Sequence, residues 1–229
     1  MADLVAPQFW VAVAEIILVN ILLSGDNAVV IALACRNLSE RQRRRGIFWG
    51  VVGAIVLRVA LTFFAMSLLA YPYLKLIGGA LLVWIGIKLI AQEESGGHEV
   101  RASDQLLTAV WTIVVADLVM SLDNVMAVAA AAKGSPPLMV FGLIISIPIV
   151  VIGSQVIMRL MERYPVLVLG GGGLLGYIAG EMAIEDPAVQ PWLAANAGHA
   201  TAAVPLLGFV VVVAVGVWLI RRRRQATAR

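Results

Sequence analysis

The chain has 229 residues, of which 61% are hydrophobic and only 14% are charged, and its mean hydropathy is +0.94. Soluble domains are closer to half apolar and a quarter charged, so this composition excludes an ordinary soluble enzyme and indicates an integral membrane protein. The net charge of +3 is small and gives no indication of nucleic-acid binding. The single cysteine, Cys35, excludes an intrachain disulfide and any multi-cysteine metal site.

Seven apolar runs of about 20 residues follow one another along the chain, the length that crosses a bilayer as a helix. We therefore predict an all-α, polytopic membrane helix bundle that forms a single membrane domain. A polar linker at 92–105 and an outer loop at 185–203 interrupt the runs, and this loop is expected to be solvated. The predicted spans are 9–34, 46–69, 72–91, 106–132, 138–161, 165–184 and 204–220.

Basic residues occur between the runs in an alternating pattern. They cluster at 36–45, at Arg101, at 159–163 and at 221–224, whereas the opposite loops hold chiefly Lys75 and Lys133. Cytoplasmic loops of membrane proteins are enriched in lysine and arginine. The pattern therefore predicts an outer N-terminus and a cytoplasmic C-terminus.

Two short acidic segments lie in the middle of the first and fourth runs. Ser24-Gly25-Asp26-Asn27 and Ser121-Leu122-Asp123-Asn124 are 97 positions apart, and Asn20 corresponds to Asp117 at the same offset. A carboxylate at membrane depth costs roughly 2.5–3.5 kcal/mol on insertion scales, so it is rarely kept without a reason. Two such residues in matching positions indicate a duplicated chain whose copies both carry polar chemistry.

The duplication extends over three spans in each copy. Arg58 corresponds to Gln155, and Tyr71-Pro72 corresponds to Tyr164-Pro165. Because three is an odd number, the two copies enter the membrane from opposite sides, which predicts two inverted three-helix repeats at about 9–91 and 106–184, followed by a seventh helix. Inverted repeats are typical of secondary transporters, whose substrate site lies near the bilayer midplane.

Carboxylate and amide oxygens are hard ligands that suit magnesium, calcium or manganese better than zinc or copper. We expect a divalent cation that is carried as a substrate, with no resident cofactor and no catalytic residue, because the sequence has no nucleophile–base pair or HExxH helix. The alternative is that the acids only pair with Arg58 and fix helix packing. The expected ligands are Asp26, Asn27, Asp117, Asp123 and Asn124, with Glu15, Asn20, Glu181 and Met120 as further candidates.

The paired Ser-Gly-Asp-Asn and Ser-Leu-Asp-Asn segments, with Asn20 and Asp117 upstream and the Tyr-Pro…Gly-Gly helices, resemble the TerC family of bacterial integral membrane proteins. The resemblance covers the first six spans and is greatest to the short, YjbE-type form. It implies a seven-span metal-ion transporter of the bacterial cytoplasmic (inner) membrane, related to the lysine-exporter superfamily, with manganese efflux as its role. The five expected ligands are the motif residues, whereas Glu15 and Asn20 rest on the residue pattern alone.

Two other functions fit the same features. One is an exporter of organic cations or amino acids, and the other is a membrane partner protein that helps to metallate secreted enzymes. The expected partners are the metal ion and the lipid bilayer, without nucleic acid, and both a homodimer and a membrane-protein partner are left open.

Overall fold

The structure is a computed structural model that describes residues 10–11, 13–14, 17–18, 25–69, 71–91, 102–131, 136–196 and 201–227. Within the helices, the side chains of residues 62–69, 102, 123–131, 136–139, 194–196, 223–224 and 226–227 lie outside this description. The described residues are almost entirely helical. The elements are α2 (Gly25–Cys35), α3 (Glu40–Leu69), α4 (Leu74–Ala91), α5 (Ala102–Ala131), α6 (Pro136–Arg163), α7 (Val166–Ile184), α8 (Gln190–Asn196) and α9 (Ala203–Thr227).

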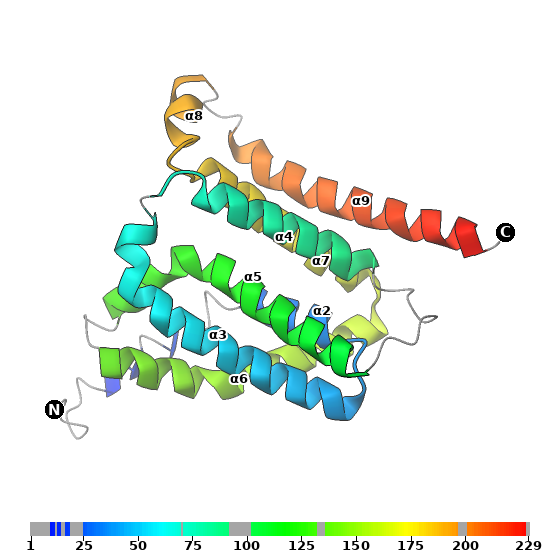
Figure 1. Cartoon of the computed structure of the whole chain (residues 1–229), viewed down its shortest axis with the longest axis horizontal. Coiled ribbons are helices and arrows are strands. Elements are labelled where there is room, and N and C mark those ends of the chain that lie inside the picture. Colours follow the sequence, from blue (N-terminus) through cyan, green and yellow to red (C-terminus); the bar gives the residue numbers. More distant parts are fainter. Residues whose placement is uncertain are drawn as a thin grey trace.

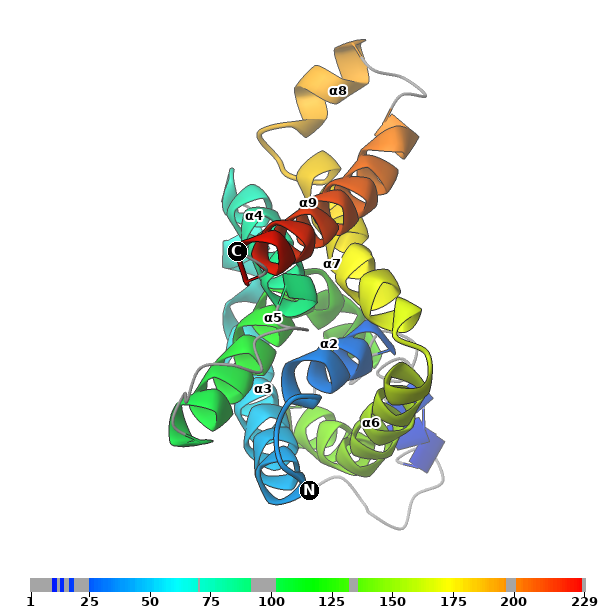
Figure 2. The same cartoon turned by 90° about the vertical axis from the view of Figure 1, so that its right-hand side faces the viewer.

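The long helices run side by side along the longest direction of the molecule (Figure 1). Helices α4, α7 and α9 form one group, in which α7 packs against both of the others. Helices α3 and α6 lie on the opposite side, with α5 and α2 between the two groups. The view along the bundle shows α2 enclosed by α5, α6 and α7 (Figure 2), and the packing contacts agree.

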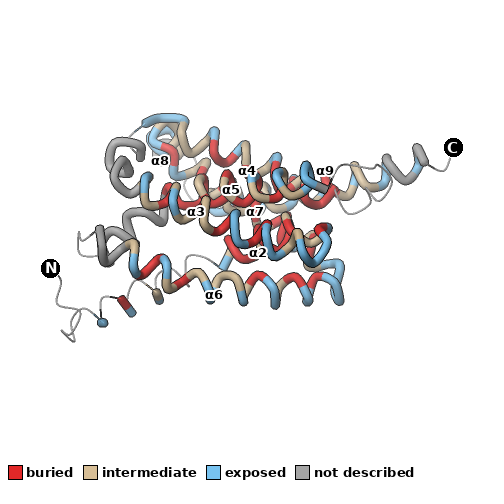
Figure 3. Tube along the Cα trace, turned by 60° about the horizontal axis from the view of Figure 1, so that its bottom comes forward, coloured by how far each residue is buried: buried red, intermediate tan, exposed pale blue. Residues whose placement is uncertain are grey.

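Among the residues that the structure describes, five helices are long and apolar enough to cross a membrane, and they correspond to the third to seventh predicted spans. Their outer faces carry large exposed apolar side chains, such as Trp111, Ile152 and Trp218, while the buried residues face inward (Figure 3). An apolar outer surface of this kind suits contact with lipid. The chain is thus an all-helical membrane protein.

The first two predicted spans compare differently with the structure. Helix α3 contains the second predicted span and begins six residues before it; its 30 residues correspond to about 45 Å. Helix α2 is an apolar helix of only 11 residues. Much of the first predicted span precedes α2 and lies outside the described residues, so the count of seven stays a prediction.

Three boundaries differ from the prediction. Helix α9 continues to Thr227, through the arginines that were expected to follow the last span. Long arginine side chains can lie along a helix and reach the polar headgroups, so the helix need not end where the apolar run ends. The predicted outer loop contains the short helix α8. Helix α5 begins at Ala102, inside the predicted linker, with Asp104 in its first turn, where a carboxylate favours the helix dipole.

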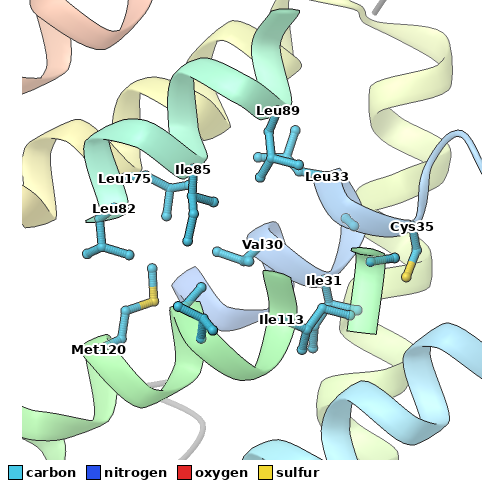
Figure 4. Packing of buried hydrophobic residues seen from close by; sticks show 14 of the residues in the cluster. Val30, Ile31, Leu33, Cys35, Leu82, Ile85, Leu89, Ile113, Met120 and Leu175 are labelled. Atoms are coloured by element: carbon cyan, nitrogen blue, oxygen red, sulfur yellow. The ribbon is translucent and has the colours of Figure 1, made fainter. Parts of the chain in front are cut away.

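The apolar core is centred on α2. Leu33 lies beside Leu89 of α4, and Ile31 lies beside Ile113 of α5 (Figure 4). Cys35 is also fully buried among apolar side chains, so it has a packing role. Helix α2 therefore has a fixed position although it is short.

Glycines allow α7 to approach its neighbours closely. A Cβ atom added to Gly176 would collide with the carbonyl of Gly208 on α9, and one added to Gly86 of α4 would lie 2.9 Å from the carbonyl oxygen of Gly172. Gly172 and Gly176 belong to a small-xxx-small line, for which close helix packing is the usual explanation in membranes. The structure confirms that explanation here.

At one end of the bundle α2, α4, α6 and α9 end and α3, α5 and α7 begin (Figure 1). Apart from Arg58, which is buried in the middle of α3, the described arginines belong to this end. Arg36 donates from Nη2 to the carbonyl oxygen of Leu89 at 2.9 Å, and Arg43 lies 3.1 Å from Glu162. The first contact joins the loop after α2 to the end of α4, and the second joins the start of α3 to the end of α6. We call this the arginine end.

The opposite end is tied together by Asp186, which was expected to be solvated but is fully buried. Its carboxylate accepts hydrogen bonds from the backbone N–H groups of Tyr73, Leu76 and Ala188 at 2.9, 3.2 and 2.8 Å. Tyr73 has a φ of 68°, which is uncommon for a residue other than glycine. The expectation of a solvated Asp186 was wrong because this residue holds the start of α4 and the strained turn before it.

Candidate functional site

A buried ion pair joins α3 to α5. Arg58 Nη2 lies 2.6 Å from Asp117 Oδ1, and the two residues are only 4% and 8% exposed. Ser121 completes the cluster, because its hydroxyl accepts from Arg58 Nε at 2.9 Å and donates to Asp117 Oδ2 at 3.1 Å. An isolated charge would be very costly at this depth, and the pairing with additional hydrogen bonds offsets that cost.

Close packing of the two helices sets the position of this pair. A Cβ atom on Gly50 would lie 2.7 Å from a methyl carbon of Ile113, and one on Gly53 would lie 2.8 Å from a methyl carbon of Val114. The two glycines of α3 therefore let α5 approach over the two turns that precede Arg58. The close approach brings the Arg58 guanidinium within reach of Asp117.

A central cavity of about 40 Å³ lies beside the ion pair, and its lining residues come from α2, α3, α5 and α6. Figure 2 shows how these four helices are arranged. A buried water needs roughly 10–15 Å³ measured in this way, so the cavity has room for about three waters or a small cation. Its wall is mostly apolar, and the polar residues on it are Asn27, Arg58, Asp117 and Ser146. The apolar lining residues are Val30, Ile31, Val51, Ala54, Ile55, Ile113, Leu143, Ile147 and Val150.

Asn27 supplies an unused acceptor to this cavity. The residue is 6% exposed, and its side-chain oxygen Oδ1 has no hydrogen-bond partner. A buried polar group without a partner costs about 1–3 kcal/mol, so it is uncommon unless a ligand or water completes it. The Asn27 oxygen is suited to a donor or to a cation.

Asp26 lies next to Asn27 in the first turn of α2, and its carboxylate accepts from the Asn27 backbone N–H at 2.8 Å. It is half-buried and interacts electrostatically with both Arg58 and Asp117. The start of a helix also favours negative charge. Two carboxylates, one guanidinium and one free amide oxygen are thus gathered in the middle of the bundle.

The remaining predicted ligands lie elsewhere or outside the description. Met120 belongs to the apolar core (Figure 4), and Glu181 lies near the end of α7, away from the cavity wall. The backbone of Asp123 and Asn124 belongs to α5, one to two turns after Asp117, but their side chains lie outside the described residues, as do Glu15 and Asn20 entirely. Within the described part of the chain, no three histidine, cysteine, aspartate or glutamate side chains are close enough to hold a metal ion.

Two polar residues of the cavity region were not predicted. Ser121 stands in the second acidic tetrapeptide, yet its role in joining Arg58 to Asp117 requires the contact between two helices. Ser146 lies in the fifth span, and its hydroxyl donates to the carbonyl oxygen of Gly142 at 2.9 Å. Its position within an apolar run could have marked Ser146 as a candidate, but most such serines form hydrogen bonds only within their own helix.

Comparison with known proteins identifies the family. The sequence profile described as "Integral membrane protein TerC family" matches residues 5–226. This chain belongs to the TerC family. It is 37% identical to YjbE of Bacillus subtilis (strain 168), described as an uncharacterized membrane protein, over 92% of this chain and 96% of YjbE.

More distant relatives are also similar over most of their length. YceF of Bacillus subtilis is 28% identical, over 77% of this chain and 72% of YceF. The inner membrane protein YgdQ of Escherichia coli (strain K12) is 27% identical, over 69% of this chain and 74% of YgdQ. No solved structure matches the chain.

Proposed function

We propose that this TerC protein exports divalent metal cations, with manganese as the first candidate, across a bacterial cytoplasmic membrane. The unused Asn27 oxygen carries the proposal, because it faces a buried cavity that also holds the Asp117 carboxylate and lies beside Asp26. Oxygen ligands of this kind suit manganese, calcium and magnesium. Asp123 and Asn124 would complete the coordination from α5.

The pattern of helix packing supports two inverted repeats within a seven-span architecture. Helices α2, α3 and α4 correspond to the first three spans, and α5, α6 and α7 to the next three. A twofold axis that exchanges the two sets would turn the α2–α6 contact into the α5–α3 contact. It would also turn α2–α7 into α5–α4, and it would leave the α2–α5 and α4–α7 contacts unchanged. All six of these contacts are present. The cavity, which is lined by α2, α3, α5 and α6, would then lie on that axis.

The arginine end supports an orientation with the N-terminus outside and the C-terminus in the cytoplasm. The arginines after α2, at the end of α6 and at the end of α9 belong to the same end of the bundle. An excess of arginine marks the cytoplasmic side of a membrane protein. In this orientation α2 begins in the membrane interior and ends toward the cytoplasm.

Arg58 has a defined part in this proposal. In the structure its guanidinium is paired with the Asp117 carboxylate, so a divalent cation that binds to Asp117 must displace the guanidinium. Arg58 thereby compensates the buried carboxylate when no cation is bound, and exchange between guanidinium and cation avoids leaving Asp117 unpaired in a low-dielectric region. Asp117 is also the proposed carrier if export is coupled to protons.

The test is ion flux in proteoliposomes that contain the purified protein, with manganese, calcium and magnesium compared at several pH values. We expect manganese flux that is abolished by Asp26→Asn and by Asp123→Asn, while both variants still insert and purify as folded protein. Asp104→Asn is the matched control, since Asp104 is an exposed acid on α5 away from the cavity and should leave flux unchanged.

Three outcomes would contradict the proposal in different ways. Unchanged manganese flux in both variants would show that the site is wrongly assigned. Flux of lysine-like solutes without any response to metals would favour the organic-cation or amino-acid exporter. Absence of all flux, together with a stable co-purifying enzyme or translocation partner, would favour the role in metallating secreted proteins.

A further inference from the structure

A second cavity lies between α3 and α6 at the arginine end. Its volume is about 400 Å³, and it shares no lining residue with the central cavity. The guanidinium groups of Arg43, Arg44 and Arg159 line it, against a single carboxylate, that of Glu40. The cavity is therefore a concave, positively charged site that the transport proposal does not use.

Two contacts hold the Arg43 side chain in place, and its Nε–H group has no acceptor. Its Nη1 lies 3.1 Å from Glu162 Oε1, and its Nη2 donates to the carbonyl oxygen of Arg36 at 3.1 Å. Its Nε is buried and has no hydrogen-bond partner. A buried donor without a partner is unfavourable, so an acceptor oxygen that reached Arg43 would be stabilised. Since the contacts to Glu162 and Arg36 fix the side chain, it would lose little freedom on binding such an oxygen.

Phosphate is the acceptor group that fits these residues best. Guanidinium groups bind phosphate oxygens through charge-assisted, often bidentate hydrogen bonds. Glu162 already pairs with Arg43, and Glu40 is the carboxylate on the cavity wall, so Arg44 and Arg159 leave an excess of positive charge that would repel a cation. This separates the site in chemistry from the central cavity.

The surroundings favour a phosphate that is attached to a lipid. Ile152, Val156 and Leu160 are spaced four residues apart on α6 and are between 47% and 61% exposed, so they form an apolar ridge beside Arg159. The cavity itself also has an apolar side, to which Ile47 and Met158 contribute. Basic pockets between membrane helices at the headgroup level are typical sites for anionic lipids. We propose that this cavity binds the phosphate group of an anionic phospholipid, with the acyl chains along the α6 ridge.

The experiment measures binding of short-chain phosphatidylglycerol to the intact, detergent-solubilised protein, with phosphatidylcholine of equal chain length as the zwitterionic comparison. We expect saturable binding of phosphatidylglycerol that is roughly 30-fold weaker in Arg44→Gln/Arg159→Gln, since each arginine near a lipid surface contributes about fivefold. Arg44→Lys/Arg159→Lys should retain most of the binding, because it keeps both charges.

The matched control is Arg41→Gln/Arg221→Gln, which removes two exposed arginines of the same end that do not line the cavity. This variant should bind like the wild type, and the melting temperatures of all variants are measured to confirm that they fold. Equal loss of binding in both double glutamine variants would overturn the proposal, since the attraction would then be diffuse. Equal binding of phosphatidylcholine, or binding of inorganic phosphate as tight as that of phosphatidylglycerol, would overturn the assignment to an anionic lipid.

Discussion

Arg58 and Asp117 form an ion pair between α3 and α5, with 2.6 Å between Nη2 and Oδ1, on the wall of the central cavity. The pair binds the second helix of the first proposed repeat to the first helix of the second. Its location means that any cation that enters the cavity meets a carboxylate already neutralised by the protein. The stability of the protein and the binding of the proposed cation substrate should therefore be linked through Arg58.

Arg58→Gln should make the protein depend on metal for stability. Removing one partner of a buried ion pair leaves an uncompensated charge and typically costs about 3–5 kcal/mol. A divalent cation could then replace the guanidinium, so manganese should raise the melting temperature of the variant more than that of the wild type. Thermal unfolding in detergent, with and without manganese, measures this difference.

The control for that experiment is the double variant Arg58→Gln/Asp117→Asn, in which no buried charge is left unpaired. It should recover part of the stability lost in the single variant and should not respond to manganese through this pair. An equal response to manganese in wild type and Arg58→Gln would show that the cation does not compete with Arg58.

Asn27→Leu should stabilise the protein and abolish the proposed cation transport. The substitution is close in volume and removes a buried acceptor that has no partner, which should gain about 1–3 kcal/mol. Ser146→Ala is the control on the same cavity, because its hydroxyl already bonds within α6 and its removal should change stability and flux little. Unfolding and flux are measured on the same preparations. A destabilised Asn27→Leu would indicate that the Asn27 oxygen has a structural partner.

Gly176→Ala should separate α7 from α9. The added methyl group would collide with the Gly208 backbone, which cannot move as a side chain can, and overpacking of this kind costs about 1–3 kcal/mol or more. Gly170→Ala, on the same helix, is the matched control, since a methyl group added there would meet no atom within 4 Å. The melting temperatures of the two variants should differ clearly, and similar values would contradict the close packing of α7 against α9.

Asp186→Asn should destabilise the protein at neutral pH by about 1–3 kcal/mol, because it weakens three backbone hydrogen bonds. Burial raises the pKa of Asp186, but hydrogen bonds from four backbone N–H groups lower it by more than burial raises it. These groups belong to Ala188, Tyr73, Leu76 and Lys75, and the resulting pKa lies below its ordinary value. A depressed folded-state pKa contributes stability that is complete above the unfolded pKa of about 3.9 and is lost as the pH falls through the folded value.

Thermal unfolding of wild type and Asp186→Asn between pH 7 and pH 3 tests this linkage. The difference in melting temperature should be constant down to about pH 4 and should shrink at lower pH, once the wild-type carboxylate begins to bind a proton in the unfolded state. A difference that does not change with pH would mean that the charge of Asp186 is not what stabilises the turn at Tyr73.

Some of the fold could be predicted because the signal is local. The third to seventh spans lie within a few residues of their predicted positions, since a run of apolar residues determines which part of the chain enters the bilayer. The end of α9 was predicted too early, because arginines can remain in a helix beyond the apolar run. The environment of Asp186 was missed because two of its partners, Tyr73 and Leu76, lie more than a hundred residues away in sequence.

The candidate site shows the same division. Duplicated acidic segments pointed to Asp26, Asn27 and Asp117, and the structure places these three residues in one region of the bundle. Met120, a further candidate in the same stretch of sequence, lies in the apolar core. Neighbouring positions on one helix point in different directions, so sequence proximity alone cannot separate a cavity residue from a packing residue.

By itself, the sequence determined that this chain is a helical membrane protein of the TerC family and that acids and amides occur deep in its spans, because hydrophobicity and local motifs are properties of the chain alone. Only the tertiary structure decided that Asp117 is neutralised by Arg58, 59 residues away, while the Asn27 oxygen is left without a partner. These facts depend on how closely α2, α3, α5 and α6 approach one another. For α3 and α5, the approach is set by the packing of Gly50 and Gly53 against Ile113 and Val114. Such packing joins residues of two segments, so neither segment alone determines it.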